Sequence, residues 1–168
     1  MNLVEEYAHT DVGRALGQHG ERMVMEGFAR SEFILKGQET NEYRGMKWTE
    51  TEHDMDMIFE RDGQAYGIEV KNTLTYMEYN EFKIKIRLCE KLGIRPVFAV
   101  RMIPTHWIDE LRRKGGFALI LKYQLYPWGL KDLAKRIVEK LELPVDTPRR
   151  LEDGTMERFE KWHKKRVK

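Results

Sequence analysis

The chain has 168 residues, a length that suits one domain and leaves little room for a second independent core. Hydrophobic residues make up 41% of the chain and charged residues 35%, a composition that supports a packed core and excludes a fully disordered protein. The net charge is only +2, so the overall charge does not select a class of partner.

The first predicted element is a helix over residues 12–28, with Asp11 as its N-cap. Its apolar residues recur at helical spacing and would face a core. The helix also keeps four glycines, at positions 13, 17, 20 and 27. Each costs roughly 1 kcal/mol relative to alanine, which favours a close approach by a sheet or by a phosphate backbone.

The next segments are predicted strands. A short strand covers 32–36, and the polar and aromatic segment 40–52 is a strand or a loop. Strands over 54–60 and 65–71 flank residues 61–64, whose Asp-Gly pair is a strong hairpin signal.

The second half of the chain alternates helices and strands. We predict a helix over 76–92 that ends at Gly93, a strand over 96–101, a helix over 104–114, a strand over 117–121, a helix over 130–141 and a last helix over 156–165. This order predicts an α/β fold with a central mixed β-sheet flanked by helices on both sides. We expect residues 1–142 to form the domain and 143–168 a basic C-terminal extension.

The sequence also indicates the cellular compartment of the protein. Cys89 is the only cysteine, so no internal disulfide can form, and it lies on the apolar stripe of its helix as a core residue does. No stretch approaches the roughly 20 apolar residues that span a bilayer, and no signal peptide is recognisable at the start. A cytoplasmic protein without a membrane partner is expected.

The predicted hairpin carries the most informative side chains. Side chains alternate across a strand, so Glu69 and Lys71 share one face while Ile68 and Val70 point to the other. Pairing through the Asp-Gly turn brings Asp56 near Glu69, although Asp54 is a second candidate for the aspartate. Two carboxylates at a sheet end suit Mg²⁺, which Mn²⁺ would replace, and a nearby lysine would act on the attacking water or on phosphate charge.

Asp56 followed thirteen positions later by Glu69-Val70-Lys71 resembles the PD-(D/E)xK nuclease superfamily, with a restriction-endonuclease-like fold. The spacing is similar to that of archaeal Holliday-junction resolvases, which also carry a glutamate on the first helix, where Glu21 stands here. The family core of helix, three strands, helix and strand agrees with the predicted order up to about Arg101. Met55 stands where many members have a proline.

The resemblance implies a role for each residue. Asp56, Glu69, the carbonyl of Val70 and Glu21 would hold the metal, and Lys71 would orient or deprotonate the attacking water. Contacts with the nucleic acid are implied for Asn72, Thr73, Lys83, Lys85 and Arg87. The implied function is a metal-dependent endonuclease acting on DNA, with branched structures in repair or recombination as candidate substrates, and a homodimer is expected.

Other interpretations stay open. Glu69 and Lys71 could form an ordinary ion pair, with Asp56 capping a turn. The fold could serve as a non-catalytic module that binds nucleic acid or a protein, or as a nuclease acting on RNA. His53, beside Asp54, is a minor candidate for the site, and the five histidines show no zinc-binding spacing.

Overall fold

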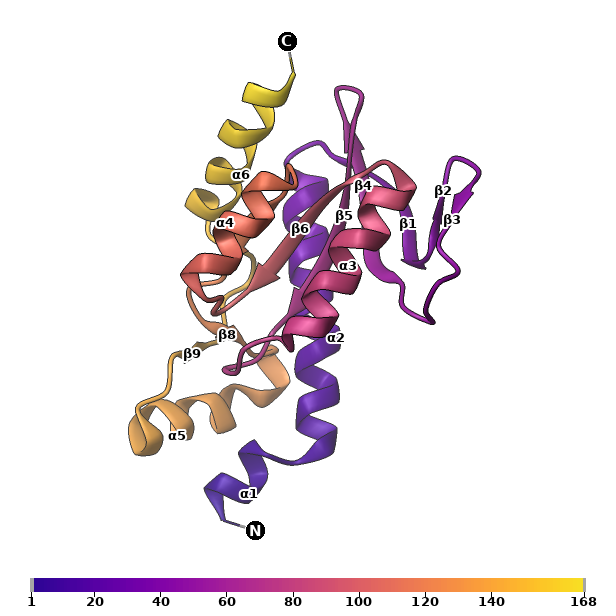
Figure 1. Cartoon of the computed structure of the whole chain (residues 1–168). Helices are drawn as coiled ribbons and strands as arrows, with labels where there is room; N and C mark the ends of the chain where they lie inside the picture. The colour runs from indigo at the N-terminus through magenta and orange to yellow at the C-terminus, as the bar shows by residue number, and fades with distance from the viewer. Residues whose placement is uncertain (1, 168) are drawn as a thin grey trace.

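The computed structural model describes residues 2–167, which fold around a five-stranded mixed sheet (Figure 1). The strands are β1 (Ile34–Thr40), β4 (Met55–Arg61), β5 (Gln64–Lys71), β6 (Arg95–Val100) and β7 (Phe117–Ile120), in the order β1-β4-β5-β6-β7. The pairs β1–β4 and β4–β5 are antiparallel, whereas β5–β6 and β6–β7 are parallel. The predicted α/β class with a central mixed sheet is confirmed.

Helices cover both faces of this sheet. On one face lie α2 (Thr10–Arg30) and α6 (Asp153–Arg166), and on the other lie α3 (Tyr79–Leu92) and α4 (Thr105–Arg113). Phe28 of α2 and Phe159 of α6 pack with ring centroids 4.9 Å apart in the first layer, and Phe82 of α3 lies 4.9 Å from Trp107 of α4 in the second. The central strands β5 and β6 are therefore buried on both sides, which explains their apolar residues, whereas β1 at the edge is mostly exposed.

Shorter elements complete the chain. They are α1 (Leu3–Tyr7), the ribbon of β2 (Glu42–Tyr43) and β3 (Met46–Lys47), the parallel pair of β8 (Gln124–Leu125) and β9 (Val145–Asp146), the 3₁₀ turn η1 (Trp128–Leu130) and α5 (Lys131–Leu141). Around the first half of α2, Leu16 packs with Tyr126 and Ile137 in a smaller apolar cluster. Figure 1 shows α1 and α5 at this end of the molecule.

Two local predictions have instructive outcomes. The hairpin turn is confirmed: Arg61 pairs with Gln64, and Asp62 and Gly63 both have positive φ, as a two-residue turn between twisted strands requires. The strand expected over 32–36 is wrong in its bounds, because it runs from Ile34 to Thr40. Glu32 has φ 68°, so the chain still turns there and cannot extend until it has left the helix end.

The segment predicted as a basic extension contributes to the main core. The last helix is confirmed, and its buried side chains include Met156, Phe159 and His163. The His163 ring joins Tyr66 of β5 (Nδ1 to hydroxyl, 2.6 Å) to Asp62 of the hairpin turn (Nε2 to Oδ2, 2.9 Å). None of the helices between residues 2 and 167 combines the length and apolar character needed to cross a lipid bilayer.

Candidate functional site

The candidate site begins where β4 and β5 separate. The antiparallel backbone pairing of the two strands ends at Met57 and Ile68. Asp56 and Glu69 would be the next pair in this register. There the side chain of Asp56 replaces a backbone partner, since its Oδ2 accepts a hydrogen bond of 2.8 Å from the N–H of Val70. A buried N–H needs an acceptor, so this bond fixes Asp56 against the Glu69–Val70 peptide.

Glu69 is a buried carboxylate with one unpartnered oxygen. Its side chain is 4% exposed, Oε2 forms an ion pair of 3.0 Å with Nζ of Lys85, and Oε1 has no hydrogen-bond partner. Burial, reinforced by the charge of Asp56, raises the pKa of Glu69 to about 8 in spite of Lys85. Each buried polar atom without a partner requires an explanation, and a cation ligated by this oxygen supplies one.

Glu21 extends the acidic group onto α2. The pKa of Glu21 is raised to about 7, first by burial, then by the charge of Asp56 and a hydrogen bond with it, and last by the charges of Glu39 and Asp54. Asp56 therefore interacts electrostatically with both Glu21 and Glu69. Glu21 and Asp56 line a cleft of about 300 Å³ between α2, β1 and β4.

Several residues of this cleft were not found from the sequence. Glu39 lines it, as do Arg22 and Gln38. In the antiparallel register of β1 and β4, Gln38 is opposite Met57, and this register brings Glu39 to the cleft. Since β1 was expected to end at residue 36, no sequence pattern could have assigned Glu39 to the site.

The donor atoms suit a hard divalent cation without forming a complete cage. Within the described residues, no three His, Cys, Asp or Glu side chains are arranged to hold a metal by themselves. Mg²⁺ usually takes one or two carboxylates and keeps several waters, so Asp56 and the free oxygen of Glu69 meet its requirement. The N–H and C=O groups of one strand residue point to the same side of the strand. The carbonyl of Val70 therefore points to the same side of β5 as the Val70 N–H, which donates to Asp56.

Lys71 lies on β5 two positions beyond Glu69 and is half-buried. Its Nζ forms an ion pair of 3.1 Å with Oε1 of Glu81 on α3, a partner that sequence reasoning missed. Burial by itself lowers the pKa of Lys71, but Glu81, Glu69 and Asp56 together outweigh it and raise the pKa above the ordinary lysine value. The ammonium group is therefore charged at neutral pH and suits stabilising negative charge rather than accepting a proton.

The structure does not place two of the predicted nucleic-acid contacts on the surface. Lys85 is 5% exposed, pairs with Glu69 and also donates a hydrogen bond to the carbonyl of Asp54. Asn72 is 3% exposed and is held by the backbone: its Nδ2 donates to the carbonyls of Leu16 and Leu125, and its Oδ1 accepts from the Leu125 N–H. Both predictions are corrected, because buried and hydrogen-bonded side chains are not available to a phosphate backbone.

The other three predicted contacts are exposed. Lys83 and Arg87 project from α3 and line a cleft of about 370 Å³ with Arg113 and Lys114 of the α4 end. Arg87 also pairs with an acidic neighbour, Glu50, at 2.9 Å, and Thr73 lies just past the end of β5. Glu90 and Glu110 line the same cleft, and Glu90 pairs with Lys114, so the basic side chains are in excess there but are partly neutralised.

The remaining candidates have other contacts, a smaller effect on the acidic group or a place in the core. His53 contacts Thr51 at 2.9 Å between Nδ1 and Oγ1. Asp54 raises the pKa of Glu21 only as the last of several causes, so its effect on the acidic group is smaller than that of Asp56. Cys89 is fully buried, and this burial raises the pKa of its thiol, as expected of a core residue.

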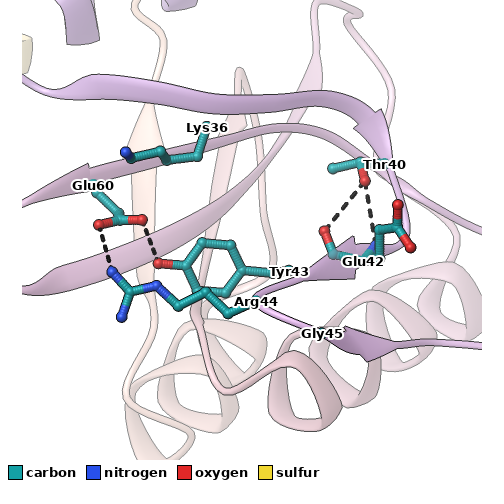
Figure 2. Close-up of a pocket in the computed structure, with 7 residues that line it drawn as sticks. All are labelled: Lys36, Thr40, Glu42, Tyr43, Arg44, Gly45 and Glu60. Atoms are coloured by element: carbon teal, nitrogen blue, oxygen red, sulfur yellow. Dashed lines mark hydrogen bonds and ion pairs between the residues drawn. The ribbon is translucent and has the colours of Figure 1, made fainter.

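A larger cleft, of about 530 Å³, lies between β1, β4 and the β2–β3 ribbon. Figure 2 shows the Tyr43 hydroxyl and the Arg44 guanidinium both directed at the carboxylate of Glu60, with Lys36 nearby. The Arg44 Nη2 to Glu60 Oε1 distance is 3.1 Å. In this cleft the Glu60 carboxylate is therefore bound by both Tyr43 and Arg44. Glu69 differs, because one of its carboxylate oxygens has no hydrogen-bond partner.

Comparison of the chain with protein-family models, with curated proteins and with solved structures finds no match.

Proposed function

We propose that this protein is a Mg²⁺-dependent endonuclease that hydrolyses phosphodiester bonds in DNA, as a member of the PD-(D/E)xK nuclease superfamily. One observation carries the proposal: Asp56 accepts from the Val70 N–H where β4 and β5 separate, it interacts with the carboxyl groups of Glu21 and Glu69, and Lys71 follows on β5. Raised pKa values for neighbouring acids in a cleft are typical of functional sites.

The fold order supports this proposal. The helix α2 precedes β1, β4 and β5, and α3 and β6 follow, with the acidic residues on the second and third of these sheet strands. This is the order of the superfamily core. The short β2–β3 ribbon is an addition between the first two sheet strands.

Each residue of the site would have its own role in the reaction. Asp56 and Glu69 would hold the cation with the Val70 carbonyl, and Glu21 would bind one of its waters. The bound cation would supply Lewis-acid stabilisation and a more acidic water. Lys71, charged at neutral pH, would orient the water and stabilise charge on the phosphate. The exposed Lys83 and Arg87 would contact the DNA backbone, which gives affinity without sequence choice.

A second function is favoured by the ion pairs at the site. Nζ of Lys85 contacts Glu69, and Glu81 pairs with Lys71, so both central groups have protein partners. This arrangement would also suit a non-catalytic module that keeps the fold and binds nucleic acid through its basic surface. The two functions differ in whether the acidic group binds metal and supports cleavage.

The deciding experiment is cleavage of labelled substrates with Mg²⁺, Mn²⁺ or EDTA. The substrates are linear duplex DNA, single strands, a flap, a four-way junction and a matched RNA duplex. Lys71→Ala is the test variant, and Lys91→Ala is the control, because Lys91 is an exposed lysine of α3 outside the site. Urea unfolding of both variants shows whether they remain folded.

We expect metal-dependent cleavage of DNA that Lys71→Ala reduces by about 10²-fold or more and Lys91→Ala leaves unchanged. The preferred substrate would then name the subclass. Binding without cleavage under every metal would refute the nuclease proposal and favour the non-catalytic module, and preferential cleavage of the RNA duplex would refute DNA as the substrate.

A further inference from the structure

The strand β7 is an open edge of the sheet, on the side opposite β1. Leu121, directly after β7, donates its N–H to the Val100 carbonyl of β6 at 2.8 Å. Because the backbone groups of successive strand residues alternate in direction, Ala118 and Ile120 turn their N–H and C=O groups away from β6. These two residues therefore present an unpaired row of donors and acceptors to any strand placed alongside.

The two edges of the sheet differ in how they are protected. The β1 edge carries charged residues, Lys36 and Glu39, and has an irregularity between Leu35 and Gly37 that disturbs its register. Both devices discourage pairing with another strand. The β7 edge, Phe117–Ile120, contains no charged residue and no irregularity in its pairing with β6.

Beside this edge lies a groove of about 220 Å³ between α4, β7 and α6, here called the β7 groove. Its apolar lining includes Ile108 of α4, Ile120 of β7 and Trp162 of α6, and Ile120 is 38% exposed. A Cβ on Gly116 would come within 2.5 Å of the Pro96 carbonyl, so close packing holds the start of β7 in place. The groove is thus an apolar surface next to backbone groups in a fixed position.

The charges around the β7 groove are all positive. Arg112 of α4 and Arg166 of α6 line it, whereas no acidic residue does. Arg166 stacks over the Trp162 ring, with Cζ 4.9 Å from the centroid. Across residues 2–167, neither arginine has a carboxylate within ion-pair distance. A ligand with apolar and acidic side chains complements this surface.

We propose that the β7 groove binds an extended, acidic peptide segment of a partner protein, which adds to the sheet as a strand beside β7. Backbone hydrogen bonds to Ala118 and Ile120 would give affinity, as in other cases of strand addition. Apolar side chains of the peptide would contact Ile108 and Ile120, and its carboxylates would pair with Arg112 and Arg166. This inference concerns a surface separate from the acidic cleft and does not depend on the nuclease proposal.

The test uses labelled eight-residue peptides and fluorescence anisotropy on the full chain. One peptide alternates valine with aspartate, a second alternates valine with lysine, and a third has prolines in place of alternate valines of the first. Ile120→Glu places a negative charge on the edge, which repels an acidic peptide, and Ala118→Pro removes an outward donor, a change that an edge strand tolerates. Ile34→Glu on the β1 edge is the matched control, since Ile34 is also an exposed isoleucine of an edge strand.

We expect the aspartate peptide to bind at least tenfold more tightly than the other two. Ile120→Glu and Ala118→Pro should each weaken its binding tenfold or more, whereas Ile34→Glu should not. Hydrogen exchange at Ala118 and Ile120 should slow when the peptide is bound. Equal binding of the aspartate and lysine peptides, or none, would overturn the proposal. So would competition by an oligonucleotide at this edge, or self-association of the chain that Ile120→Glu abolishes.

Discussion

The buried carboxyl group of Glu69 predicts that the metal-free protein loses stability as the pH rises. The folded chain keeps a proton on Glu69 up to a pKa of about 8, whereas the unfolded chain releases it near the ordinary value of 4.5. Between these values the folded state binds the extra proton, so each pH unit lowers the free energy of unfolding by about 1.4 kcal/mol. This stabilisation is complete below the lower value and is lost as the pH passes the upper one.

The assay is urea unfolding in EDTA, followed by tryptophan fluorescence, at several pH values between about 5 and 8. Glu69→Gln keeps the shape of the side chain and cannot titrate in this range, so its slope should lack the contribution of Glu69 and keep that of Glu21, whose pKa is also raised. The comparison uses slopes, because the substitution also changes the contact between residue 69 and Nζ of Lys85, which shifts the absolute stability. Equal slopes for the wild type and Glu69→Gln would refute the reasoning.

Two further predictions use the same unfolding assay. Gly17→Ala should stabilise the protein by roughly 0.5–1 kcal/mol, since an added Cβ meets nothing within 4 Å. Gly20→Ala should instead destabilise it by roughly 1–3 kcal/mol, because the Cβ would lie 2.6 Å from Cβ of Asn72. Effects of the same sign would contradict this packing of α2. Phe159→Ala should cost about 3–5 kcal/mol, since its ring is buried, and the exposed Lys161→Ala less than about 0.5 kcal/mol. A small loss for Phe159→Ala would mean that α6 does not stabilise the core.

The fold was largely predictable because its signals are local. Hydrophobic periodicity indicated the helices, and Asp62-Gly63 indicated the hairpin. The turn also determines the register of β4 and β5, which brings Asp56 towards Glu69. The bounds of β1 were not predictable in this way, because the left-handed conformation of Glu32 and the pairing with β4 decide where the strand begins and ends.

The surroundings of the candidate site were only partly predictable. Lys85 was assigned to the surface because lysine usually faces water, yet it lies among the buried residues of α3, where its Nζ contacts Oε2 of Glu69. Asn72 was assigned to a phosphate, yet its amide is satisfied by the backbone around it. A sequence does not show which side chains a distant element will enclose.

The sequence by itself therefore determined the α/β class, the hairpin and the grouping of Asp56, Glu69 and Lys71, since strand alternation and a two-residue turn act over a few residues. The tertiary structure decided the rest. It enclosed Glu69 beside Lys85, brought Glu21 and Glu39 to the same cleft, and left β7 open between α4 and α6. These features depend on how distant elements pack together, and packing determines burial, pKa and free backbone edges.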